Sequence, residues 1–146
     1  MSDLPFIDER TREVAAPAER TWEALIAPGG TGRGAEPIAR ALGCDPATRS
    51  GDPGAVGSTT PGFRVARSIP PRELALEGQH HFSRYALTFL IEEAGAGRSR
   101  LRARTHAEFP GVSGTIYRAM VIGTRGHVLA TRRMLDGIAA RAERAG

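Results

Sequence analysis

A strict alternation of two residue classes over residues 100–109 limits most severely what this chain can fold into. One class is apolar or small, and the other is charged or polar. The first comprises Leu101, Ala103, Thr105, Ala107 and Phe109, and the second Arg100, Arg102, Arg104, His106 and Glu108. A period of two is typical of a strand in an antiparallel sheet with one buried and one solvated face. The sequence therefore predicts such a sheet.

The same period appears in three earlier segments. It predicts strands over Phe63–Ile69, Glu73–His80 and Tyr85–Ile91. Pro70 and Pro71 separate the first two strands, and a turn rich in Gly precedes residues 100–109. We therefore expect a sheet in which neighbouring strands follow one another along the chain.

The two ends of the chain supply the predicted helices. An extended segment, Phe6–Ala15, leads to Pro17, and the helix formers after it predict a short helix over residues 18–26. Near the other end, Ser113 is the expected N-cap of an amphipathic helix of about 30 residues. Its inner stripe comprises Ile116, Met120, Gly123, His127, Thr131, Met134 and Ile138, with Tyr117, Val121, Thr124, Val128 and Leu135 beside it.

Between the first helix and the strands, Gly29–Gly62 is rich in Gly, Pro, Ser, Thr and Asp. One short helix, Glu36–Leu42, fits inside it, and the rest is either loop or a weak strand around Ala55–Val56. Neither flank could build a core alone, so this region is not a linker between domains. We expect one domain over residues 1–146, since 146 residues match the usual size of about 100–200 residues per domain.

Composition excludes several kinds of chemistry. All 20 basic residues are Arg, so the chain has no Lys for a phosphate-binding loop or a Schiff base. The single Cys44 excludes an intrachain disulfide and a Cys-rich zinc site. We expect a cytoplasmic protein without stable membrane insertion, because no signal-like N-terminus and no apolar run of about 18 residues is present.

Three other patterns do not support the sites that they resemble, which are a nucleotide site, a nucleophile elbow and a metal site. Gly30–Ala35 matches a loose dinucleotide-binding pattern, but a predicted helix precedes it where a strand is required. Gly111–Thr115 lacks the final Gly of a nucleophile elbow. His80 and His81 are adjacent on a strand and would point to opposite faces. We expect no metal and no cofactor.

Basic residues at alternate positions form the strongest charge pattern. They are Arg98, Arg100, Arg102 and Arg104. Such a row could follow a phosphate backbone, but no aromatic residue is interleaved with it for base stacking. Neighbouring acids, namely Glu77, Glu92, Glu93 and Glu108, could neutralise it. With a net charge of only +4, we interpret the row as a solvated sheet face and expect no nucleic-acid partner.

The order of the predicted elements and two short motifs resemble the START/Bet v 1-like (SRPBCC; polyketide cyclase/dehydrase and lipid transport) superfamily. The motifs are Ala-Pro-x-x-x-x-Trp, at Ala16–Trp22, and Gly-x-x-Gly, at Gly54–Gly57. The resemblance implies an α+β helix-grip fold, with a curved antiparallel sheet around a long C-terminal helix and two short helices after the first strand. It also implies a small apolar molecule in a cavity between sheet and helix. It implies no single reaction, because members include carriers, cyclases, hydratases and co-chaperone domains.

Small residues at the expected interface of sheet and helix are consistent with a cavity. They are Gly78, Ala103, Thr105 and Ala107 on the strands and Gly123 and Thr124 on the helix. The alternative is close packing of helix on sheet without a cavity. We expect binding of a small hydrophobic or amphipathic ligand, such as a lipid, a polyketide or an aromatic compound. An aromatase/cyclase-like or hydratase-like enzyme, acting without metal on a polyketide-type carbonyl, is the alternative.

The polar residues expected on inner positions are Arg67, His80, Tyr85 and His127. In the enzymatic alternative, Arg67 would stabilise an enolate and the others would transfer protons. Each could instead be a strand-end or rim residue without a catalytic role. The complete expected lining of the cavity is Phe63, Val65, Arg67, Leu76, His80, Tyr85, Leu87, Phe89, Ala103, Thr105, Phe109, Tyr117, Met120, Thr124 and His127.

Two further patterns lie on the first strand and the last helix. The first is charged and the second is apolar. Arg10 and Arg12 share a strand face with Val14, and we interpret them as edge-strand charges. An ion pair with a neighbouring acid, Asp8 or Glu9, is another outcome. On the outer side of the helix, Ile122 and Leu129 form a small apolar seam for a homodimer contact.

Overall fold

The computed structural model describes residues 4–27, 43, 45–46, 48–80, 83–108 and 126–144. Its elements are β1 (Phe6–Val14), α1 (Ala18–Ile26), β2 (Thr59–Thr60), β3 (Phe63–Ile69), β4 (Glu73–His80), β5 (Ser83–Glu93), β6 (Ser99–Glu108) and α4 (Gly126–Arg144). The predicted helix Glu36–Leu42 and the start of the last helix at Ser113 lie outside the described residues.

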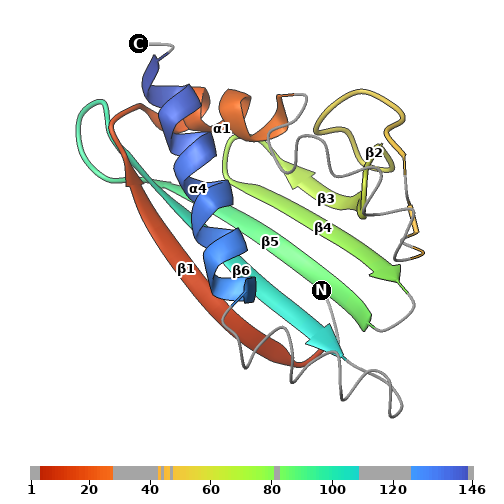
Figure 1. The fold of residues 1–146 in the computed structure, drawn as a ribbon. Coiled ribbons are helices and arrows are strands. Elements are labelled where there is room, and N and C mark those ends of the chain that lie inside the picture. Colours follow the sequence, from red (N-terminus) through yellow and green to blue (C-terminus); the bar gives the residue numbers. More distant parts are fainter. Residues whose placement is uncertain are drawn as a thin grey trace.

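The strands form one six-stranded sheet in the order β1-β6-β5-β4-β3-β2, and all neighbours are antiparallel. The sheet is curved, α4 crosses one of its faces over β1 and β6, and α1 lies at one end (Figure 1). We call the face toward α4 the inner face and the other the outer face. The predicted α+β class with an antiparallel sheet gripping a C-terminal helix is confirmed.

Alternation of burial explains why the strands form where the sequence predicts them. Along β6, odd-numbered residues from Ser99 to Ala107 are buried and the even-numbered residues between them are half-buried. The buried set meets the apolar stripe of α4, in which Thr131, Leu135 and Ile138 are buried as expected. One amphipathic face on each element therefore positions helix on sheet.

A large part of the described core lies near α1, at what we call the α1 end of the sheet. Val14, Leu25, Phe89, Leu101 and Ile138 are almost completely buried there or beside it. These residues come from three strands and both helices. Removal of their apolar surface from water, at about 25 cal/mol per Å², is the main force that holds the helices on the sheet.

Buried hydroxyls connect α1 to the sheet. Ser99 Oγ on β6 donates to the Ala16 carbonyl at 2.8 Å, and it lies 2.7 Å from Thr21 Oγ1 on α1. Because the Ser99 hydrogen is used, Thr21 is the donor in the second bond. The two bonds fix the position of α1 against the start of β6.

The segment before β2 consists of bends and turns, so the weak strand considered around residues 55–56 does not form. Gly54 has a φ of +81°, and a Cβ atom there would lie 2.8 Å from Ile26 Cγ2 of α1. Gly57 also has a positive φ, and its N–H donates to the Val65 carbonyl at 2.9 Å. The Gly-x-x-Gly motif therefore makes turns packed against α1, in agreement with the loop alternative for this region.

Candidate functional site

Arg67, a predicted inner-face residue, lies on the outer face. The β3–β4 register shifts between Val65 and Arg67, so that Val65 pairs with Leu76 but Arg67 pairs with Ala75. An irregularity of one residue reverses the face on which every later side chain lies. Arg67 is exposed and forms an ion pair with Glu73, 3.1 Å from Nε to Oε2. Its proposed role as an enolate stabiliser in the cavity is therefore wrong.

Most other described members of the expected lining are on the inner face. Those within the buried core cluster are Val65, Leu76, Leu87, Phe89 and Ala103, and Phe63 packs against that cluster. They form a continuous apolar wall across β3, β4, β5 and β6. Contact between this wall and a ligand stays a prediction.

Tyr85 is tied to the backbone of a neighbouring turn. Its hydroxyl donates to the Gly62 carbonyl at 2.7 Å, and its ring meets Phe63 edge-on with centroids 5.4 Å apart. A Cβ atom on Gly78 would collide with the Gly62 carbonyl oxygen and with the Tyr85 ring. The small residue at 78 therefore allows close packing and does not leave a void there, contrary to the expectation.

Thr105 presents an unsatisfied hydroxyl on the inner face. Its side chain is buried, and Oγ1 has no hydrogen-bond partner among the described residues. It lies between two small residues of the same face, Ala103 and Ala107, and pairs across the sheet with Leu87 on β5. Buried polar atoms are nearly always hydrogen-bonded, so this one needs an explanation.

Beside Thr105, β1 brings an ion pair to the inner face. Asp8 is the register partner of Thr105 and Arg10 that of the buried Ala103, so both lie on the inner side of the strand. Arg10 Nε is 3.3 Å from Asp8 Oδ2, and the two side chains are 41% and 21% exposed. β1 is an edge strand as interpreted, and of the two acids considered for the alternative ion pair, Arg10 pairs with Asp8. Arg10 is a site residue that its sequence pattern, a charge on an edge strand, does not reveal.

The remaining predicted residues cannot be placed. Phe109, Tyr117, Met120 and Thr124 lie outside the described residues, as does Ile122 of the proposed dimer seam. His80 and His127 have a described backbone in β4 and α4, but their side chains also lie outside the description. Leu129, the other member of the seam, is half exposed on α4.

A small cavity lies on the inner face near the α1 end. Its volume is about 50 Å³, and its apolar lining includes Ile26, Val65 and Leu74. Because one water molecule occupies about 30 Å³ of the liquid, this space is too small for an organic ligand. We therefore place the candidate site at the opposite end of the inner face. This far end is defined by Tyr85, Thr105, Ala107, Asp8 and Arg10.

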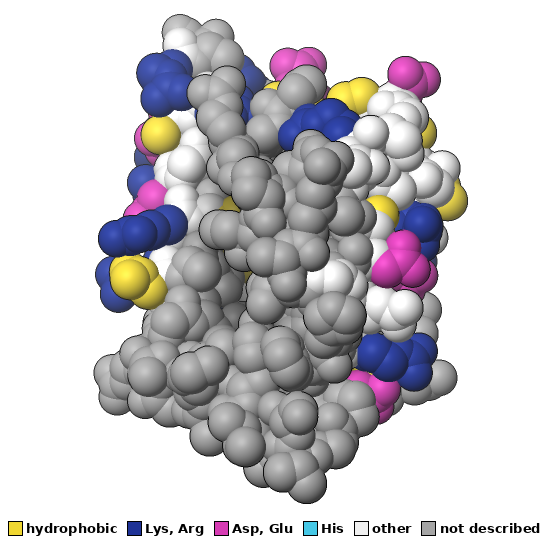
Figure 2. All heavy atoms as spheres, turned by 45° about the vertical axis from the view of Figure 1, so that its right-hand side comes forward, with side chains coloured by type: hydrophobic (Ala, Val, Ile, Leu, Met, Phe, Trp, Pro, Cys, Tyr) yellow, Lys and Arg dark blue, Asp and Glu magenta, His cyan; other side chains and the backbone are white. Residues whose placement is uncertain are grey.

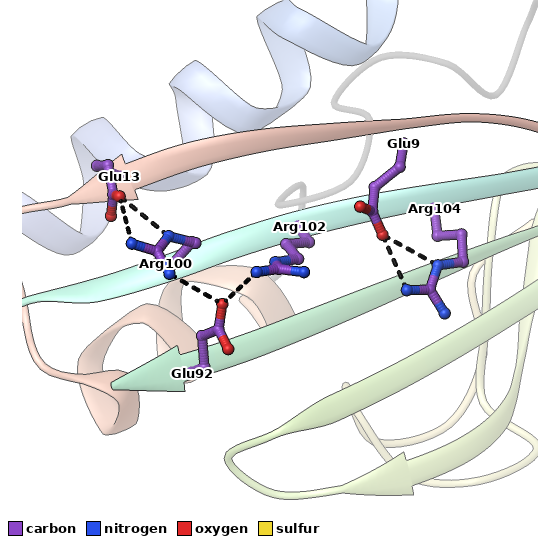
Figure 3. Close-up of polar contacts among 6 residues, drawn as sticks. All are labelled: Glu9, Glu13, Glu92, Arg100, Arg102 and Arg104. Atoms are coloured by element: carbon purple, nitrogen blue, oxygen red, sulfur yellow. Dashed lines mark hydrogen bonds and ion pairs between the residues drawn. The ribbon is translucent and has the colours of Figure 1, made fainter. Parts of the chain in front are cut away.

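Three arginines of the row, on the outer face, are neutralised within the chain (Figure 3). Arg100 pairs with Glu13 and Glu92, Arg102 pairs with Glu92, and Arg104 pairs with Glu9. The hydrogen bond that Arg100 donates to Glu13, followed by the one that it donates to Glu92, raises the pKa of Arg100 above its ordinary value. Two of the three acids come from β1, and the sequence analysis had named only Glu92.

The described surface carries no metal cluster, and its charges are mixed. On the face drawn in Figure 2, the coloured side chains carry both signs of charge together with isolated hydrophobic residues. Among the residues that the structure describes, no cluster of His, Cys, Asp and Glu is suited to a metal ion. Nor is any helix in that part of the chain long and apolar enough to cross a membrane.

Comparison with known proteins rests on structure alone, because no family model and no curated protein matches the sequence. A conserved protein from Geobacillus kaustophilus is similar at a TM-score of 0.60, with 15% identity over 94% of this chain and 95% of that one. Protein CV1439 from Chromobacterium violaceum has a TM-score of 0.59, with 15% identity over 95% and 99%. Truncated norcoclaurine synthase from Thalictrum flavum has a TM-score of 0.58, with 16% identity over 95% and 96%.

At these identities the likeness shows the fold and no activity. It extends over nearly the whole length of both chains in each comparison, including the sheet and the C-terminal helix. The chain shares its α+β helix-grip fold with these solved structures.

Proposed function

We propose that the protein binds a small amphipathic molecule against the far end of the inner face. The observation that carries this proposal is the buried hydroxyl of Thr105, which has no partner among the described residues. Leaving such a group unsatisfied costs about 1–3 kcal/mol. A ligand oxygen or N–H group that bonds to it would recover this energy, so the hydroxyl is suited to orienting a ligand.

The surroundings of Thr105 fit the apolar body of such a ligand. Ala107 is the next inner-face residue of β6, and Leu87 is the register partner of Thr105 on β5; both are buried apolar residues. An apolar wall with one or two polar groups is the usual composition of a small-molecule site. The fold adds support, because norcoclaurine synthase, which shares it, has been solved with a transition-state analogue.

The enzymatic alternative has no described constellation in its favour. The cyclase- or hydratase-like reaction was based on an arginine and a proton-transfer group that face the same carbonyl. Arg67 lies on the outer face, and Tyr85 on the inner face is bonded to the Gly62 carbonyl. The far end therefore supports binding better than catalysis.

The test begins with native mass spectrometry of the purified protein, to detect any co-purified small molecule. A thermal-shift panel of lipids and aromatic compounds follows. A ligand at a hundred times its Kd stabilises the folded state by about 2.7 kcal/mol, which raises Tm measurably. We expect at least one amphipathic compound to do so.

Thr105→Val then tests the site, because it removes the hydroxyl and keeps the side-chain shape. We expect the affinity to fall by about tenfold, the effect of one lost hydrogen bond to a ligand. Thr88→Val on the outer face of β5 is the matched control and should bind like the wild type. The proposal fails if no compound shifts Tm, or if Thr105→Val binds every hit as tightly as the control does.

A further inference from the structure

A second hollow lies at the rim of the inner face, between β1 and α4. It has a volume of about 490 Å³, and its lining includes Arg10 and Arg12 from the strand and Arg132 and Leu135 from the helix. We call it the arginine groove. It is distinct from the core packing at the α1 end, because its lining is mostly charged.

The acids that line the groove are already neutralised. Glu9 receives two hydrogen bonds from Arg104, at 3.0 and 2.9 Å. Asp136 is held by Arg12, with Nε 3.1 Å from Oδ1. Neither carboxylate is therefore left to balance a further arginine.

Two arginines retain donors toward the groove. Arg132 is exposed and forms no ion pair with any residue that the structure describes. Arg10 uses Nε in its bond to Asp8, and no bond of its two terminal nitrogens to a described residue is seen. A guanidinium presents five N–H donors in a planar fork suited to carboxylate, sulfonate or phosphate oxygens. The groove thus has an excess of positive charge and of anion-binding donors.

The groove also adjoins the proposed site. Arg10 pairs in register with Ala103, and the preceding inner residue of β1, Asp8, pairs with Thr105. Leu135, which lines the groove, is itself part of the buried core cluster. The groove and the proposed site therefore share Arg10 and lie next to each other along β1.

We propose that the arginine groove binds the anionic end group of the ligand, a carboxylate, sulfonate or phosphate joined to an apolar body. This inference rests on the proposed function, and it names the class of ligand as acidic amphiphiles. Paired guanidinium contacts with an anion are among the stronger polar contacts in proteins. Acidic amphiphiles then bind better than neutral molecules of the same shape.

Two fluorescent probes that differ only in the anion provide the test. They are 1-anilinonaphthalene-8-sulfonate and N-phenyl-1-naphthylamine, which lacks the sulfonate. We expect the wild type to bind the sulfonate about tenfold more tightly, as one charge-assisted contact predicts. Arg132→Gln and Arg10→Gln should each remove most of this preference, and Arg132→Gln, at a residue outside the far end, should leave the affinity for the neutral probe unchanged.

Arg133→Gln is the matched control. It removes the same charge from the next residue of α4, which is exposed and does not line the groove. The inference is overturned if this variant weakens sulfonate binding as much as Arg132→Gln does. It is also overturned if the wild type binds both probes equally, a result that leaves the proposed function intact.

Two more results separate the remaining explanations. If neither probe binds the wild type, the proposed function fails together with the inference. If sodium phosphate displaces the sulfonate probe while sodium chloride of equal ionic strength does not, the groove takes free phosphate. That result overturns the assignment to an amphiphile.

Discussion

Ser99 and Thr105 are both buried hydroxyl residues on the inner face of β6, yet their surroundings differ completely. Ser99, at the α1 end, donates to the Ala16 carbonyl and accepts from Thr21. Thr105, at the far end, has a buried Oγ1 with no partner in the described part of the chain. The first hydroxyl holds two elements together, whereas the second holds none. We infer that the α1 end stabilises the folded state and that the far end binds the ligand.

Truncating the core at the α1 end should have the largest effect on stability. Leu101 is completely buried beside Ser99, so Leu101→Ala should lower the free energy of unfolding by about 2–5 kcal/mol. Chemical denaturation measures this change. Leu129→Ala, at a half-exposed position of α4, is the control and should change stability by less than about 0.5 kcal/mol. A loss similar to the control's would show that the core is not concentrated here.

The close packing of Tyr85 forms one boundary of the far end of the inner face. It can be tested at Gly78. Gly78→Ala would drive a methyl group into the Gly62 carbonyl oxygen, at a cost of about 1–3 kcal/mol in unfolding free energy. Gly137→Ala on α4 meets nothing within 4 Å and should stabilise the helix by up to about 1 kcal/mol. If both variants have the same Tm as the wild type, the packing around Tyr85 is looser than described.

The two hydroxyls themselves give the sharpest comparison. Ser99→Ala leaves Thr21 and the Ala16 carbonyl unsatisfied, so it should cost about 1–3 kcal/mol. Thr105→Val removes no bond to a described residue, so without ligand we expect neutral or slightly improved stability. Urea unfolding of the ligand-free proteins measures both. Equal losses in the two variants would contradict the division into a structural end and a binding end.

The smallest effect is expected on the outer face. Arg104→Gln breaks the ion pair with Glu9 (Figure 3). Exposed ion pairs contribute about 0.2–1 kcal/mol, and salt weakens them further. Thermal unfolding at low and high salt should show a difference from the wild type that shrinks as salt rises. A loss of unfolding free energy larger than that of Ser99→Ala would contradict the small contribution to stability that we assign to the outer-face ion pairs.

The sequence predicted the strands well because alternation and burial follow the same period. The bounds of β3 and β4 agree with prediction, and β6 was recognised from its pattern. The face of Arg67 could not be predicted, because the register shift after Val65 depends on pairing with β4 and no residue type marks it. In the same way, Glu9 and Glu13 became partners of the arginine row only through the pairing of β1 with β6.

The site was predicted less completely than the fold. Thr105 was included because of its parity, but its missing partner is visible only in three dimensions. The sequence indicates only an edge charge at Arg10, because it cannot show that α4 approaches the edge strand beside this residue. The small size of Gly78 suggested a void, whereas the turn at Gly62 fills that space.

The edges of the sheet have a further consequence, for encounters between copies of the protein. β1 and β2 are the two outermost strands. An open strand edge can recruit another chain and begin aggregation, most readily when it is long and apolar. In β1, five of nine residues are charged, and β2 is only two residues long. Neither edge offers a good template for another strand, so crowded molecules of this protein should resist growth of the sheet from one copy into the next.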